Sequence, residues 1–112
     1  MNNKVKKPIP KLIKLNKIKK YQRLLKPKFG SLKIHSGQVV LRKYENVGEH
    51  ITDNVEEMLI ILEGSAEVII GKKKVIKAEE GSVVYIPPNT FHNIKNIGSN
   101  ILRYIFTTSP VV

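Results

Sequence analysis

The sequence predicts an all-β fold, a small barrel or sandwich of antiparallel strands, on three observations. From Ser31 onward, short runs rich in β-forming residues follow one another. Turn residues separate these runs at intervals of about 8–12 residues, which is typical of sandwiches and barrels. No long helical pattern lies between the runs, so we expect antiparallel sheets. A chain of 112 residues has room for one domain.

The expected strands are short and mostly β-branched or aliphatic. In chain order they are residues 32–35, 38–44, 49–52, 57–62, 66–70, 74–77, 82–86, 91–95 and 101–107. Each run ends at residues that favour turns. In the same order these turns are Ser36-Gly37, 45–48, Asp53-Asn54, Glu63-Gly64, 71–73, Glu80-Gly81, Pro87-Pro88 and 96–100.

Charge separates a basic N-terminal arm, residues 1–30, from the barrel, residues 31–112. Residues 1–44 hold 14 Lys and Arg and no acidic residue, whereas residues 45–112 hold 6 basic and 9 acidic residues. Such an arm attracts nucleic acid, anionic lipid or an acidic partner. Lysines outnumber arginines 17 to 3, however, and base readout favours arginine, so we favour a solvated arm.

We expect residues 1–11 to be extended or disordered, because Pro8 and Pro10 stand among lysines. From Leu12 to Leu25 the aliphatic residues fit either helical spacing or a strand of period 2. Pro27 and Gly30 end whatever forms there.

Composition excludes several classes of site. With no cysteine, the chain has no disulfide, thiolate metal site or cysteine nucleophile. No apolar run approaches the length of a membrane helix, and no apolar region follows the basic N-terminus as in a secretion signal. We therefore expect a cytoplasmic protein without membrane contact. No phosphate-binding glycine motif and no hydrolase nucleophile motif occurs.

Glu57 heads a strand that is apolar on both faces, Glu57–Leu62. A carboxylate there points into something buried, where it must be paired, hydrogen-bonded or bound to metal. With His50 and His92 it completes a donor set of two imidazoles and one carboxylate, which suits a metal with open coordination positions. A structural ion pair of Glu57 with Arg103 or Arg42 is the alternative.

Two segments carry a family resemblance. Gly48–Gly64 resembles the first cupin motif, in which a Glu, six residues and a Gly follow His-x-His; Glu57, Gly64 and His50 take these positions. Gly81–Asn96 resembles the second motif, with Gly81, Pro87, His92 and Asn96 in place and Asn89 where glycine is usual. Asparagine tolerates the left-handed backbone that glycine adopts.

The resemblance covers residues 37–107 and implies a double-stranded β-helix, a jelly-roll barrel. It implies a metal site of His50, Glu57 and His92 for Fe, Mn, Ni, Zn or Cu, or a pocket whose metal has been lost. Thr52 occupies the position of a histidine that is usually a ligand, and threonine is a poor ligand for such metals. Small cupins commonly dimerise, and Lys11–Leu25 is the candidate dimerisation segment.

We predict ligand contacts for Thr52, Arg103 and Tyr104, with the role of Arg103 conditional on its facing inward. Thr52 either binds a metal-bound water or fills space. His35 is predicted as a surface or strand-end residue. Core or pocket-wall positions are predicted for the aromatic residues Tyr44, Tyr85, Phe91, Tyr104 and Phe106.

Two functions follow from the family resemblance. The first is a metal-dependent small-molecule cupin, such as an isomerase, an epimerase or a dioxygenase. The second is a metal-free binding or sensory barrel without catalysis. A third hypothesis, nucleic-acid binding through the lysine arm, has no helix-turn-helix to support it and would rest on phosphate contacts alone.

Overall fold

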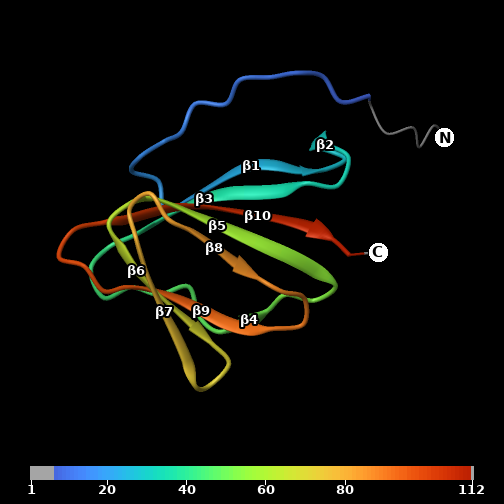
Figure 1. Ribbon diagram of the computed structural model, residues 1–112. Coiled ribbons are helices and arrows are strands. Elements are labelled where there is room, and N and C mark those ends of the chain that lie inside the picture. Colours follow the sequence, from blue (N-terminus) through green and yellow to red (C-terminus); the bar gives the residue numbers. More distant parts are fainter. Residues whose placement is uncertain (1–6, 112) are drawn as a thin grey trace.

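The computed structural model describes residues 7–111, and each regular element in that range is a β-strand (Figure 1). Residues 1–6 of the predicted arm lie outside the described residues. The strands are β1 Tyr21–Pro27, β2 Gly30–Ser31, β3 His35–Leu41, β4 His50–Ile51, β5 Val55–Glu63, β6 Ser65–Ile70, β7 Lys74–Glu79, β8 Val83–Ile86, β9 Phe91–Asn96 and β10 Leu102–Pro110. The predicted all-β class is confirmed. No described helix is long and apolar enough to cross a membrane.

The strands form two sheets, ordered β2-β1-β3-β10-β5-β8 and β4-β9-β6-β7 (Figure 1). The pairings among β3 to β10 are antiparallel, as expected, and only the two-residue contact of β1 with β2 is parallel among the described strands. Alternate residues of both sheets point inward and fill the space between them. The buried core comprises Val39, Leu41, Leu59, Ile61, Ala66, Val68, Ala78, Val84, Ile86, Ile94, Leu102 and Tyr104.

The predicted turn at Ser36-Gly37 is wrong, because β3 runs straight through it. A Cβ at Gly37 would lie 2.7 Å from a ring atom of Phe106 and 2.8 Å from one of Tyr21. Those two rings stack across β3 with their centroids 6.3 Å apart. Glycine is needed there for the close approach of two aromatic rings, and not for a change of direction.

The six-stranded sheet begins inside the segment predicted as an arm. The sequence left helix or strand open for Leu12–Leu25. Because β1 pairs antiparallel with β3, the structure shows a strand over Tyr21–Pro27. Before β1, the chain crosses the outer face of this sheet. There the Gln38 side-chain amide donates to the Asn16 carbonyl at 2.6 Å, and the Gln22 amide donates to the Lys14 carbonyl at 2.9 Å.

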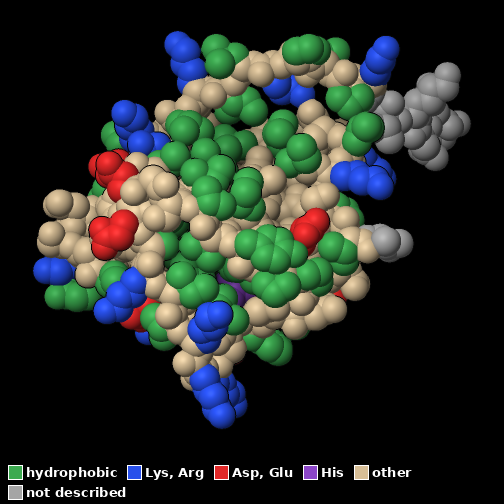
Figure 2. All heavy atoms as spheres, viewed as in Figure 1, with side chains coloured by type: hydrophobic (Ala, Val, Ile, Leu, Met, Phe, Trp, Pro, Cys, Tyr) green, Lys and Arg blue, Asp and Glu red, His purple; other side chains and the backbone are tan. Residues whose placement is uncertain are grey.

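Three of the five aromatics predicted for the interior are instead exposed. Tyr44, Tyr85 and Phe91 have exposed fractions of 81%, 57% and 54%. Tyr85 and Phe91 occupy the outward phase of the alternation in β8 and β9. Hydrophobic side chains gather over the region of β5, β8 and β10 (Figure 2), where Met58 and Val83 are exposed beside Tyr85.

Candidate metal centre

The two histidines of the predicted site are cross-strand neighbours in the four-stranded sheet. β4 pairs antiparallel with β9, and the register sets His50 opposite His92. Their ring centroids lie 4.1 Å apart, with the ring planes inclined at 61°. His50 is exposed at the rim of the barrel, whereas His92 is 1% exposed.

Glu57 reaches the histidines from the facing six-stranded sheet. Its neighbours across β5 are Ile86 of β8 and Thr108 of β10, and its side chain points between the sheets. One ligand atom from each of His50, Glu57 and His92 lies within 4.8 Å of the others. The structure therefore brings together the three residues that the sequence predicted as metal ligands.

Backbone carbonyls hold both imidazoles in the same way. The Nδ1 atom of His50 lies 3.0 Å from the Gly48 carbonyl oxygen, and the Nδ1 atom of His92 lies 3.0 Å from that of Thr90. An imidazole that donates its Nδ1 proton to a carbonyl presents an unprotonated Nε2, the form that binds metals.

The Nε2 atom of His92 is buried and without a well-aligned hydrogen bond among residues 7–111, although Glu57 Oε1 lies 3.0 Å away. Lone pairs at that distance repel, so a proton or a metal cation is needed between them. Burial lowers the pKa of His92, but the Glu57 carboxylate and the Thr90 carbonyl raise this pKa by more, leaving it above its ordinary value. This donor set fits a divalent transition metal.

Two hollows share His50 and Glu57 as lining residues. A cavity of about 180 Å³ extends inward from His50 and Glu57 between apolar side chains, namely Val39, Val47, Ile94, Tyr104 and Phe106. A mouth of about 350 Å³ opens outward from the same two ligands and is lined by His35, Ile51, Thr52, Asp53, Val55, Phe106 and Thr108. A ligand there would meet apolar walls and a polar rim, the usual combination in small-molecule sites.

Thr52 lines this mouth, but its hydroxyl bonds to the backbone. The Oγ1 atom donates to the Pro87 carbonyl oxygen at 2.7 Å and accepts from the Thr90 amide at 3.0 Å. Thr52 thereby joins β4 to the turn that leads into His92. Asn89, in the same turn, has a φ of 57°, the left-handed backbone that its place in the motif requires.

Tyr104 and Arg103 point in opposite directions from β10. Tyr104 lines the inner cavity, and burial, followed by the charge of Glu57, raises the pKa of its phenol, which stays a neutral donor. Ligand contact was predicted for Arg103 only if its side chain faced inward, and it does not. Its guanidinium lies on the outer face, where it donates to Glu63 at 3.2 Å and to Gln38 at 3.0 Å.

His35 stands at the start of β3, in agreement with the strand-end prediction, but the sequence did not indicate that it lines the mouth. Its register across β10 places it opposite Thr108, which is itself opposite Glu57. Its ring meets the edge of Phe106 with 5.5 Å between centroids. Nothing in the local sequence signals this placement, because it depends on the pairing of three strands.

The sequence model of the family described as "Cupin domain" matches residues 37–108, more than half of the chain. The chain belongs to the cupin family. The predicted resemblance is thus confirmed, and the two sheets are those of a cupin double-stranded β-helix.

Solved structures show the same cupin fold. An RmlC-like cupin family protein with a double-stranded β-helix fold, from Methanocaldococcus jannaschii, superposes with a TM-score of 0.78 at 25% identity, covering 91% of this chain and 92% of that one. A predicted oxalate decarboxylase from Thermotoga maritima superposes with a TM-score of 0.75 at 21% identity, covering 81% of this chain and 79% of that one. The second similarity establishes the fold alone.

Two sequence relatives match part of the chain. A protein named polyketide synthase CurC, from Streptomyces cyaneus, is 30% identical over 76 residues, which are 67% of this chain and 48% of that protein. An uncharacterized protein of Methanocaldococcus jannaschii is 27% identical over 77 residues, which are 69% of this chain and 66% of that protein. This cupin therefore spans about half of the first relative and just under two-thirds of the second.

Proposed function

We propose that this cupin binds a divalent transition metal through His50, Glu57 and His92 and holds a small-molecule ligand beside it. The buried Nε2 atom of His92 carries the proposal, because it faces a carboxylate oxygen at 3.0 Å without an aligned hydrogen bond in the described chain. Both imidazoles place Nδ1 at 3.0 Å from a backbone carbonyl oxygen, a contact that favours the tautomer with an unprotonated Nε2 that a metal requires.

The metal is Fe, Mn, Ni, Zn or Cu, which accept nitrogen and oxygen ligands together. When bound, such a metal supplies Lewis acidity or an oxygen-activating centre, as in cupin isomerases, epimerases and dioxygenases. The chain itself supplies the apolar cavity behind the ligands and the neutral phenol of Tyr104 as a hydrogen-bond donor.

A second function, a metal-free binding or sensory barrel, is favoured by two observations. Thr52 stands where a fourth ligand is usual, and its hydroxyl is committed to the Pro87–Thr90 turn. A protonated His92 would also form an ion pair with Glu57 across their 3.0 Å separation, which would satisfy both buried groups without metal.

Titration of chelator-treated full chain with cobalt(II), followed by visible absorption, tests the metal proposal. The wild type should saturate at one metal per chain, and Glu57→Gln and His92→Ala should weaken binding at least about tenfold. Glu63→Gln is the matched control, because it removes the same charge on the outer face beside Arg103. If the wild type does not saturate, or if Glu63→Gln weakens binding as much as Glu57→Gln, the metal-free barrel becomes the better account.

A further inference from the structure

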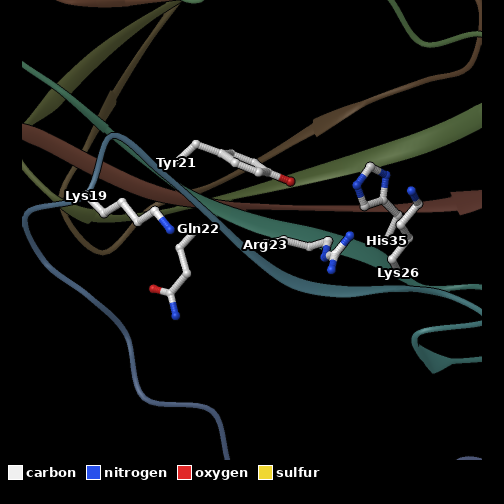
Figure 3. A pocket seen from close by; sticks show the side chains of 6 residues that line it. All are labelled: Lys19, Tyr21, Gln22, Arg23, Lys26 and His35. Atoms are coloured by element: carbon white, nitrogen blue, oxygen red, sulfur yellow. The ribbon is translucent and has the colours of Figure 1, made fainter.

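A cleft of about 570 Å³ runs along β1, near the edge of the six-stranded sheet, and is lined by Lys19, Tyr21, Gln22, Arg23, Lys26 and His35 (Figure 3). Its lining includes three cationic side chains and no acidic one in the part of the chain that the structure describes. The ion pairs within residues 7–111 are Lys20–Glu45, His92–Glu57 and Arg103–Glu63, and the cleft's cations take part in none of them.

Two of the three cations of the cleft lie against one aromatic ring. The guanidinium of Arg23 and the ammonium of Lys26 each lie 5.6 Å from the centre of the Phe29 ring. Such contacts favour a fixed position for a cation without neutralising its charge. In Figure 3 the Tyr21 hydroxyl points toward His35, on the side where the Arg23 side chain ends. Arginine and lysine so placed suit an oxyanion, which guanidinium binds through paired hydrogen bonds.

The cleft adjoins the metal centre through shared walls. His35 lines both the cleft and the mouth of the metal pocket. His35, Thr108 and Glu57 form one row across β3, β10 and β5, so His35 stands two strand spacings from Glu57. That separation is roughly 10 Å between backbones. Phe106 contacts the rings of Tyr21 and His35 and also lines the metal pocket.

We propose that the cleft is an oxyanion subsite, and that the ligand of this cupin is a small acid with a carboxylate or phosphate group. The proposal rests on the function proposed above. Arg23 and Lys26 would bind the anionic group, while the opposite end of the ligand would reach across the Phe106 wall to His50 and Glu57. The anion-binding residues lie on β1, three strand spacings from Glu57 on β5, so such a ligand would span roughly 15 Å between backbones, less the reach of the side chains at each end.

A single-stranded nucleic acid is the competing occupant of a basic surface with aromatic side chains. The geometry favours the small acid, because the cleft shares His35 with the mouth of the metal pocket. A nucleic acid would use the phosphate-binding cations without needing the pocket, and it would extend along the lysine-rich segment before β1.

The test is a titration of the isotope-labelled full chain with inorganic phosphate, followed by backbone amide NMR at constant ionic strength. Shifts should saturate and should cluster at Arg23, Lys26, His35 and Phe106. Arg23→Gln and Lys26→Gln should each weaken phosphate binding about tenfold, the loss expected for one charge-assisted hydrogen bond. Lys73→Gln is the matched control, in the turn between β6 and β7, far from β1 (Figure 1).

Any of three outcomes would overturn the subsite. The first is that the amide shifts do not saturate with phosphate. The second is that Lys73→Gln weakens phosphate binding as much as Lys26→Gln does, and the third is that a ten-nucleotide single-stranded DNA binds through Arg23 and Lys26 while phosphate does not. Cobalt titration of Arg23→Gln separates this proposal from the previous one, because that variant should keep the metal affinity of the wild type. Saturable phosphate binding in a chain that takes no metal would support the subsite and refute the metal centre.

Discussion

Replacing Thr52 with valine tests whether this residue positions His92, a proposed metal ligand. The substitution keeps the shape of a 3%-exposed side chain but removes the hydroxyl that joins Pro87 and Thr90. The Thr90 amide then loses an acceptor, which costs about 1–3 kcal/mol when it stays unsatisfied, and the lost donor to Pro87 adds about 0.5–1.5 kcal/mol. Because water reaches half-buried Thr90, we expect a net loss of about 2 kcal/mol.

Thr52→Ser is the matched variant, since it keeps the hydroxyl and loses one methyl group, at about 1 kcal/mol. Thermal unfolding followed by circular dichroism should lower the Tm of Thr52→Val by roughly 10 °C, and that of Thr52→Ser by about half as much. Cobalt affinity should fall about 10–100-fold in Thr52→Val and stay close to that of the wild type in Thr52→Ser. A valine variant as stable and as metal-avid as the wild type would refute the positioning role.

Three further predictions concern backbone, pH and assembly. Gly64→Ala should lower the free energy of unfolding in urea by about 3 kcal/mol or more, because Gly64 has a φ of +88° and the new Cβ would collide with the Ile101 carbonyl. Gly71→Ala should lower it by only roughly 1–2 kcal/mol, because Gly71 has a φ of +60° and open space around it. Equal losses in the two variants would contradict this explanation. In the presence of chelator, the free energy of unfolding should fall as the pH rises from about 6.5 through the raised pKa of His92, because the folded chain binds a proton there that the unfolded chain has lost. A free energy of unfolding that rises over that pH range, or the same slope in His92→Gln, would show that the His92–Glu57 pair does not set the pH dependence. Light scattering should find a homodimer that Val83→Glu dissociates and Lys73→Glu does not. Val83 lies 60% exposed beside Met58 and Tyr85, so this exposed face, and not the segment Lys11–Leu25 suggested by the sequence, is the interface tested. A monomeric wild type would exclude it.

The sequence predicted the cluster of His50, Glu57 and His92 because its signal is local. Each residue occupies a position of a short motif that resembles a cupin motif, and the resemblance implies all three together. The burial of Glu57 was predicted because the strand that it heads is apolar on both faces, and in the structure Glu57 is 7% exposed.

Features that depend on strand register lay beyond the sequence. His35 joins the mouth of the pocket only because β3, β10 and β5 pair so that His35, Thr108 and Glu57 share a row. The sequence predicted a turn at Gly37, because its neighbours in the structure, the rings of Tyr21 and Phe106, lie on strands that are distant in the sequence.

The sequence also could not predict which face of its strand the Arg103 side chain would occupy. Arg103 lies between the buried residues Leu102 and Tyr104, and this alternation, visible once β10 is placed, turns it toward Gln38 and Glu63 on the outer face. For Thr52 the sequence left open a bond to metal-bound water or a space-filling role, whereas in the structure its hydroxyl bonds to the backbone of the turn before His92.

Elemental analysis of the purified, untagged protein tests the metal centre most directly, after incubation with each of Fe, Mn, Ni, Zn and Cu. We predict close to one metal per chain in the wild type, a loss of that metal in His92→Ala, and its retention in His35→Ala. His35→Ala removes a histidine from the same mouth that is not among the proposed ligands. A folded wild type that takes up none of these metals, or a His92→Ala variant that retains the metal, would contradict the proposed centre.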